Sequence, residues 1–291
     1  PYLDASQATA PPPLLTPSGD LYRGPRAWLN MPAVYADNTA TANQQALESL
    51  REGADGVCFV LRHNVSWEDL LQGIDWAICS LCFISESEDN NATTLTAYIR
   101  KHYPGASLQG GWFSPSPQTV TGLTSGVVFP SLPSPIDMLT QGFTNLLQKE
   151  GGPHGISLTL GTDFFLEIAK LRSTRTLQMQ LKDHFKQDHS LLLHARSLAW
   201  PSPGYNPHST MLKHTTTAMA AIMGGCDILT LEEDPTGRPM TRRIARQVSN
   251  LLREESQFGR VADPVAGSYL VEDLTRQITD AVWANLKPLL K

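Results

Sequence analysis

Eight short apolar runs, separated by segments with helical character, constrain the fold of this chain more than any other feature. The runs begin at Gly56, Trp76, Ser107, Gly126, Gly155, Ser190, Asp227 and Arg260. Nearly continuous apolar runs of this length are typical of strands that are buried on both faces. Alternation of strand and helix through eight such runs predicts a (β/α)8 TIM barrel, an α/β fold, with an open doubly wound sheet as the alternative. No Gly-x-Gly-x-x-Gly motif follows the first run, which disfavours a dinucleotide-binding fold.

The segment before these runs is rich in proline and alanine and shows no periodicity. We therefore expect residues 1–34 to form an extended N-terminal arm whose end packs through Tyr22, Trp28 and Leu29, and residues 35–291 to form the barrel. Cap signals mark two of the expected helices, because Ser66 precedes acidic residues and Ser134 precedes a proline. Further helices are expected near residues 40–52, 164–185 and 274–289.

Composition and charge disfavour several classes of partner. The net charge is −5 and no long basic run is present, so we expect no nucleic-acid partner. No apolar run reaches about 18 residues, so we expect no membrane span. The 4 cysteines stand in apolar surroundings, and Cys79 and Cys82 would point to opposite faces of a strand. They predict buried, reduced thiols and hence a cytoplasmic protein or one of an organelle matrix.

Functional residues of such barrels lie at the carboxyl ends of the strands. The polar residues that follow the apolar runs are Arg62, His63, Ser85, Glu86, Ser114, Ser131, Ser134, Thr162, Asp163, His194, Arg196, Glu232, Glu233, Asp234 and Asp263. The leading catalytic candidates among them are His194, Arg196 and Asp263. His194 and Arg196, two apart on one strand, face the same way and can reach one anionic ligand. The alternative is that Arg196 pairs with Glu232 or Glu233 on the neighbouring strand.

The residue types alone indicate no specific chemistry. His194 with the acidic residues from Glu232 to Asp234 and Asp263 could hold a divalent metal, but the His-x-His pair of metal-dependent barrel hydrolases is absent. Arg62 and His63 are adjacent instead, so we expect no metal site. Neither a Gly-x-Ser-x-Gly elbow nor a phosphate-binding loop of the Walker type is present.

A series of segments in the second half resembles the methylmalonyl-CoA mutase family in the same order and at nearly the same spacing. The segments are FFLEIAKLRSTR from Phe164, HARSLAW from His194, MLKHTTTAMAAIMGGCD from Met211, RRIARQVSNLLREES from Arg242 and DPVAGSYLVEDLT from Asp263. The resemblance covers roughly residues 155–290 and is specific. YRGPRAW and YADNTATANQQALESLREGADGV extend it more faintly into the first half.

The resemblance implies adenosylcobalamin chemistry for a holoenzyme. In this family the pantetheine arm of the acyl-CoA splits the barrel along its length, and cobalamin lies across the rim. A C-terminal flavodoxin-like domain supplies the cobalt-ligating histidine in an Asp-x-His-x-x-Gly motif. Asp183-His184 and Asp188-His189 do not match that motif. We therefore expect no C-terminal cobalamin-binding domain and no cofactor bound by this chain alone.

Departures from the family pattern fall where catalytic members bind substrate. A stretch with a catalytic Tyr and His is replaced by VVFPSLPSPIDM from Val127, and Leu192 and Lys213 stand at positions of family arginines. Glu232 and Glu233 add negative charge where an anionic substrate would bind. The chain thus resembles most the non-catalytic small (beta) subunit.

That resemblance implies a catalytically silent barrel paired in a heterodimer with a catalytic large subunit, which isomerises methylmalonyl-CoA and succinyl-CoA. Whether the chain is itself an enzyme stays open, and we expect it to be inactive alone. One alternative is an active acyl-CoA mutase barrel whose cobalamin domain is on a separate or missing segment. The other is a stand-alone barrel with unrelated rim chemistry. A homodimer of the isolated chain also stays open.

Overall fold

The described strands form one parallel sheet that closes into a barrel. The computed structural model describes residues 14–86, 90–106, 108–116, 118–147, 155–185, 191–199, 206–233 and 239–290. Hydrogen-bonded neighbours in the sheet follow the order β1-β9-β8-β7-β6-β5-β4-β3-β2. The strands are β1 (Leu29–Asn30), β2 (Ala33–Tyr35), β3 (Gly56–Leu61), β4 (Ser80–Ser85), β5 (Gly110–Ser114), β6 (Thr124–Val128), β7 (Gly155–Leu160), β8 (Leu192–Ser197) and β9 (Ile228–Thr230).

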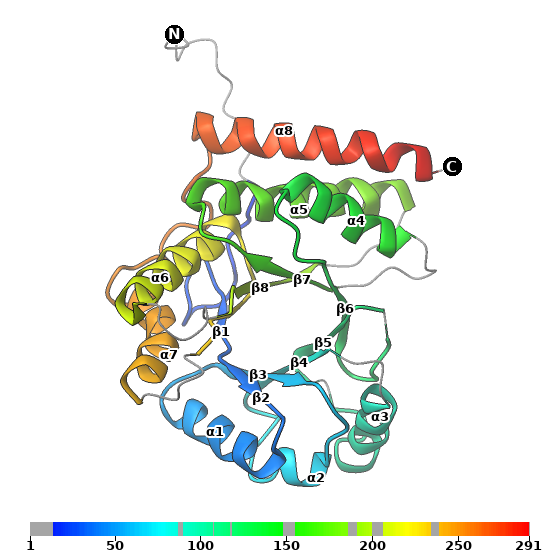
Figure 1. Ribbon diagram of the computed structural model, residues 1–291, viewed down its shortest axis with the longest axis vertical. Coiled ribbons are helices and arrows are strands. Elements are labelled where there is room, and N and C mark those ends of the chain that lie inside the picture. Colours follow the sequence, from blue (N-terminus) through cyan, green and yellow to red (C-terminus); the bar gives the residue numbers. More distant parts are fainter. Residues whose placement is uncertain are drawn as a thin grey trace.

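Closure of the sheet depends on the stretch from residue 29 to residue 35. Its first part, β1, pairs with β9, and its second part, β2, pairs with β3. Between them, the Met31 amide donates to the carbonyl of Leu229 and the Cys58 amide donates to the carbonyl of Pro32, both at 3.0 Å. Proline is tolerated here because it need only accept a hydrogen bond. β1 and β2 therefore act as one strand, and the predicted (β/α)8 barrel is confirmed (Figure 1).

One predicted strand is wrong. The first seven apolar runs correspond to β3 through β9, but residues 260–268 form turns and bends rather than a strand. The remaining barrel strand is residues 29–35, most of which lie in the segment that we expected to be an arm. Trp28, just before it, is 1% exposed and donates from Nε1 to Ser249 Oγ at 2.8 Å.

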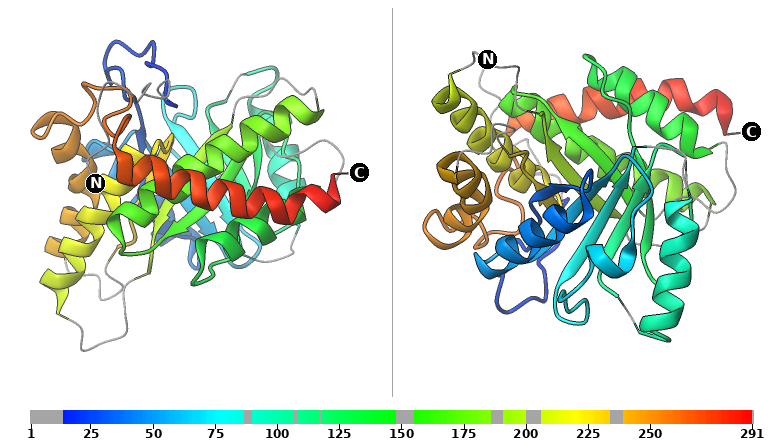
Figure 2. Two further views of the ribbon diagram at one scale, coloured as in Figure 1. Left: turned by 90° about the horizontal axis from the view of Figure 1, so that it is seen from above. Right: turned by 60° about the horizontal axis from the view of Figure 1, so that its bottom comes forward.

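Helices surround the barrel (Figure 1). They are α1 (Thr39–Arg51), α2 (Trp67–Leu70), α3 (Asn91–His102), α4 (Pro135–Leu147), α5 (Phe164–Phe185), α6 (Pro207–Gly224), α7 (Pro239–Glu254), α8 (Tyr269–Leu286) and the 3-10 turn η1 (Lys287–Leu289). The predicted caps are present, since Ser66 Oγ accepts from the Asp69 amide at 3.4 Å and Ser134 Oγ accepts from the Asp137 amide at 3.3 Å. Helix α8 lies across α5 and α4 as an outer layer (Figure 2). Within the described ranges, no helix has the length and apolar character needed to cross a membrane.

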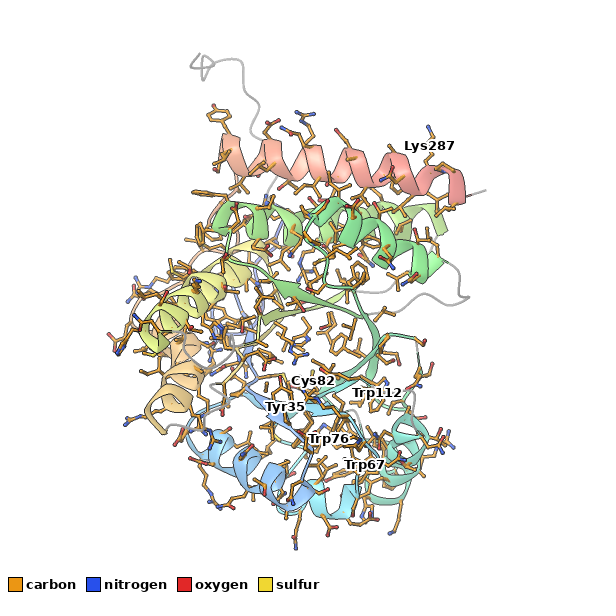
Figure 3. The ribbon with its side chains drawn as sticks, in the orientation of Figure 1. Tyr35, Trp67, Trp76, Cys82, Trp112 and Lys287 are labelled. Atoms are coloured by element: carbon orange, nitrogen blue, oxygen red, sulfur yellow. The ribbon has the colours of Figure 1, made fainter. Side chains whose placement is uncertain are left out.

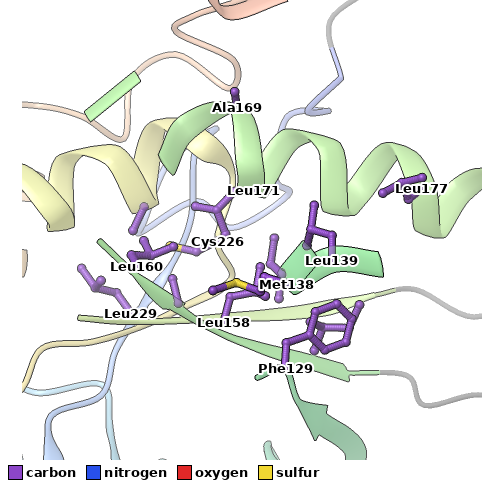
Figure 4. Close-up of a cluster of buried hydrophobic side chains, with 14 of the residues drawn as sticks. Phe129, Met138, Leu139, Leu158, Leu160, Ala169, Leu171, Leu177, Cys226 and Leu229 are labelled. Atoms are coloured by element: carbon purple, nitrogen blue, oxygen red, sulfur yellow. The ribbon is translucent and has the colours of Figure 1, made fainter. Parts of the chain in front are cut away.

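Apolar side chains gather in separate layers inside and outside the sheet. Outside β6 to β9, Phe129, Leu158 and Leu171 belong to a cluster beneath α4 and α5 (Figure 4). On the opposite side, Trp67 and Trp112 pack between the sheet and the first helices (Figure 3). A smaller cluster fills the barrel interior and consists of Met31, Cys58, Cys82, Ile84, Phe113 and Ile228. This inner cluster determines what the barrel axis can accept.

Candidate functional site

Phe113 closes the barrel axis because three neighbouring strands offer glycines around its ring. A Cβ atom added at Gly111, Gly126 or Gly155 would lie 2.7, 2.5 or 3.0 Å from a ring atom of Phe113. Only glycine leaves room for the ring at the first two of these positions. The ring also packs against His194, with 5.2 Å between the ring centroids. Sequence reasoning did not single out Phe113, although the pair of glycines before Trp112 in β5 marks a close approach.

His194 lies inside the barrel and both of its ring nitrogens are engaged. Nδ1 lies 2.8 Å from Ser157 Oγ, and Nε2 lies 2.8 Å from Thr230 Oγ1. Thr230 donates its hydroxyl proton to the carbonyl of Met31 at 2.8 Å, so its oxygen accepts from Nε2. Nδ1 then accepts from Ser157. Complete burial, together with the charge of Arg196, lowers the pKa of His194 to about 3, so the imidazole is neutral.

Arg196 is one inward-facing position closer to the carboxyl end of β8. Its Nε pairs with Glu232, and its Nη2 donates to Tyr35 Oη at 3.0 Å. The Tyr35 hydroxyl in turn donates to Glu232 Oε2 at 2.7 Å. Burial raises the pKa of Tyr35, and the negative charge of Glu232 raises it further. The alternative expectation, an Arg196–Glu232 pair, is therefore confirmed, and the predicted anion-binding arginine is already neutralised.

A second layer of charges covers Arg196, Tyr35 and Glu232 on the solvent side. The Arg62 guanidinium stacks on the Tyr35 ring at 4.6 Å from the ring centroid, and its Nε lies 3.1 Å from Glu86. Glu86 also lies 3.6 Å from Arg196 Nη1. We call the set the rim network, which consists of Tyr35, Asp37, Arg62, Glu86, Arg196 and Glu232. It closes the carboxyl end of the barrel with paired charges.

Asp263, the third catalytic candidate, lies away from the other two. Its Oδ1 accepts from Arg172 Nη1 at 2.7 Å, and its Oδ2 accepts from the amides of Leu14 and Leu15 at 3.0 and 3.3 Å. The Leu15 side chain lies against Gly225, which precedes β9. Asp263 therefore belongs near the amino ends of the strands. The structure brings together His194 and Arg196 but not Asp263.

The acidic residues after β9 have arginine partners. Glu233 lies 2.8 Å from Arg242 and 3.7 Å from Arg246, and burial raises its pKa. Asp234 lies outside the described residues. Across the ranges that the structure describes, no three His, Cys, Asp or Glu side chains are grouped so as to hold a metal ion.

The cysteines are free thiols. Cys58 and Cys82 face each other on neighbouring strands inside the barrel. Burial raises the pKa of Cys58 to about 12 and that of the partly buried Cys79 to about 11. A thiol with such a pKa is protonated at neutral pH and is a poor nucleophile.

Tyr35, which the sequence analysis missed, permits a direct test of the rim network. Replacing Tyr35 with Phe removes the hydroxyl that links Arg196 to Glu232 and is expected to lower the free energy of unfolding by about 1–2 kcal/mol. Urea unfolding at pH 7 measures the change. The matched control is Tyr22→Phe, because the Tyr22 side chain is 83% exposed. Equal stability of the two variants would contradict the network's role.

Comparisons with known proteins agree with the resemblance seen in the sequence. The sequence profile of the family described as methylmalonyl-CoA mutase matches residues 156–289. The methylmalonyl-CoA mutase small subunit of Porphyromonas gingivalis is 28% identical over 86% of this chain and 50% of its own length. The mitochondrial methylmalonyl-CoA mutase of Bos taurus is 37% identical over 42% of this chain and 18% of its own length.

The chain thus spans half the length of the small subunit, and its match covers about a fifth of the mitochondrial enzyme. Among solved structures, the Yersinia pestis dihydropteroate synthase aligns with a TM-score of 0.41 at 14% identity, covering 80% of this chain and 91% of that one. By the sequence matches, residues 156–289 are similar to the methylmalonyl-CoA mutase family, and the chain as a whole is similar to a small subunit of that enzyme.

Proposed function

We propose that this chain is a catalytically silent barrel subunit of a methylmalonyl-CoA mutase, and that it acts as the partner of a cobalamin-binding catalytic subunit. The observation that carries the proposal is the filled barrel axis. In catalytic members, the pantetheine arm of the substrate runs along that axis. Here Phe113, Met31 and Cys58 occupy it, each with 0% of its surface exposed.

The substrate-binding residues expected in a catalytic barrel are directed elsewhere or neutralised. Phe129 lies in the stretch that replaces the family's Tyr and His, and its ring packs outside the sheet against Phe143, with 5.2 Å between the ring centroids. Arg196 is paired with Glu232. A carboxylate substrate at this rim would meet Glu86 and Glu232 without an unpaired arginine from the rim network to receive it.

Adenosylcobalamin does not fit the described rim as a catalytic cofactor. Radical chemistry on an acyl-CoA requires the reacting carbon to lie beneath the cofactor, inside the barrel. The rim network and the Phe113 ring, which closes the barrel axis, lie between the position of the cofactor and that of the reacting carbon. The cofactor therefore belongs, in this proposal, to the catalytic partner. The proposal places the complex in the cytoplasm or in an organelle matrix.

Co-expression with a catalytic large subunit from the same organism tests the proposal. We expect a stable heterodimer by size-exclusion chromatography, with turnover of methylmalonyl-CoA in the presence of adenosylcobalamin. The chain alone should show no turnover and no change in the corrin spectrum at micromolar concentrations. Turnover by the chain alone would favour an active mutase barrel. Failure to associate with the large subunit would favour a stand-alone barrel.

A further inference from the structure

A cavity of about 310 Å³ lies at the carboxyl end of β7, where this strand meets the first turns of α4 and α5. Its walls include apolar side chains from several elements, namely Leu132 after β6, Met138 on α4, Leu166 on α5 and Leu198 after β8. A space of this size is in the range of small-molecule sites. The rest of its wall is polar and contains a group that the proposed function does not use.

That group is a buried ion pair on α5. Glu167 and Lys170 are one helical turn apart, with side chains 8% and 4% exposed, and Lys170 Nζ lies 2.5 Å from Glu167 Oε2. Nζ also donates to the carbonyl of Thr159 at 3.0 Å. Gly161 lies beside the other carboxylate oxygen, because a Cβ atom added to it would be 3.1 Å from Glu167 Oε1. All four residues line the cavity, so the paired charges lie at its wall.

A lysine in these surroundings has chemistry that a surface lysine lacks. Burial lowers the pKa of Lys170, although the Glu167 carboxylate opposes the shift. A desolvated lysine releases its proton more easily, and its neutral amine forms imines with carbonyl compounds. The Glu167 carboxylate is placed to take that proton, and no other described group donates a hydrogen bond to Oε2. Stability alone does not account for the pair, because packed apolar side chains of similar size would stabilise the fold as well.

From this geometry we propose that the cavity binds a small aliphatic aldehyde, which Lys170 holds as an imine. The ammonium proton passes to Glu167, the neutral nitrogen attacks the carbonyl carbon, and Glu167 protonates the carbonyl oxygen. In the resulting carbinolamine, the nitrogen returns a proton to Glu167, which transfers it to the departing hydroxyl. The products are one water molecule and a protonated imine, whose positive charge pairs with the Glu167 carboxylate. The buried pair is therefore neutral overall before and after the reaction.

The alkyl chain of the aldehyde lies against Leu132, Met138 and Leu166 in this site. The activity goes beyond the proposed function and does not depend on it. No residue of the rim network or of the apolar cluster inside the barrel lines the cavity.

Reductive trapping tests the proposal. The full chain is incubated with limiting butanal and sodium cyanoborohydride at pH 7, and peptide mass spectrometry locates the butyl group that reduction of the imine leaves. We expect a single butyl group per chain, on Lys170. Lys170→Arg keeps a positive charge beside Glu167 and should lose this label. The double variant Lys170→Met with Glu167→Gln removes both charges together and should lose it too. Circular dichroism confirms that each variant folds.

The chain offers a matched control for each part of the site. Lys101 also pairs with a glutamate, Glu68 at 3.6 Å, but its side chain is 68% exposed and does not line the cavity. Leu198→Trp narrows the cavity, leaves the ion pair in place and is tolerated because Leu198 is 44% exposed. It should reduce labelling of Lys170 to the level of Lys101. Leu212→Trp, at a 72% exposed leucine outside the cavity, should be labelled like the parent. Labelling of Lys170 no faster than that of Lys101, or undiminished in Leu198→Trp, would overturn the proposal.

Discussion

Replacing Asp263 with Ala is expected to lower the free energy of unfolding by about 3–5 kcal/mol. Arg172 and Asp263 are buried partners, each with 2% of its side chain exposed. In the Ala variant, the Arg172 guanidinium keeps only Glu272 as an acidic partner, whose Oε1 lies 2.8 Å from Nη2. The amides of Leu14 and Leu15 lose their acceptor. Removing one partner of such a pair is strongly destabilising because the remaining buried charge is uncompensated.

Urea unfolding at pH 7 measures this loss, and an exposed pair provides the control. Asp273 and Arg276 form an ion pair on α8 with side chains 53% and 65% exposed. Asp273→Ala should leave the unfolding free energy almost unchanged, because water screens that pair. Asp263→Asn keeps an acceptor for the two amides and should fall between Asp263→Ala and the parent. A loss for Asp263→Ala no larger than that for Asp273→Ala would show that Asp263 does not secure the N-terminal segment.

The fold was largely predictable because the strand signal depends on burial from both sides. Seven runs with continuous apolar character became β3 through β9, since a parallel barrel buries both faces of its strands. The strand over residues 29–35 was not predicted, because Pro32 interrupts its apolar pattern. The pairing of this stretch is set by partners distant in the sequence, Leu229 and Cys58. The run from Arg260 had apolar content but also a Pro and a Gly, and it forms turns between α7 and α8.

That single misplaced strand also explains the error about Asp263. A residue after a barrel strand is expected at the rim, whereas Asp263 follows a helix and a turn and lies near the amino ends of the strands. The spacing of His194 and Arg196 gave a correct common direction, because alternation along a strand is local. Their partners were not predictable in full, since Ser157, Thr230 and Tyr35 reach them from other strands.

His194 in the barrel interior is expected to make the free energy of unfolding depend strongly on pH. The pKa of His194 falls from 6.5 to about 3 in the folded protein, whereas the unfolded chain titrates near its ordinary value. The neutral His194 therefore contributes its full stabilisation above pH 6.5, and this contribution to the free energy of unfolding is lost as the pH falls toward 3. Each pH unit in that window removes about 1.4 kcal/mol of stability. We expect a loss of about 2–3 kcal/mol between pH 6.5 and pH 4.5 from this residue alone.

Comparison with His194→Gln isolates that contribution. Glutamine can hydrogen-bond to Ser157 and Thr230 but does not titrate, so the variant should start less stable at pH 7.5 and lose stability more slowly on acidification. Carboxylates and His214, whose pKa burial also lowers, titrate equally in both proteins and cancel in the difference. Unfolding free energies measured from pH 7.5 to 4.5 should therefore converge. A constant difference in unfolding free energy between parent and variant would mean that His194 takes up a proton as readily in the folded protein as in the unfolded chain. Phe113 and the rim network would then not seal the barrel around it.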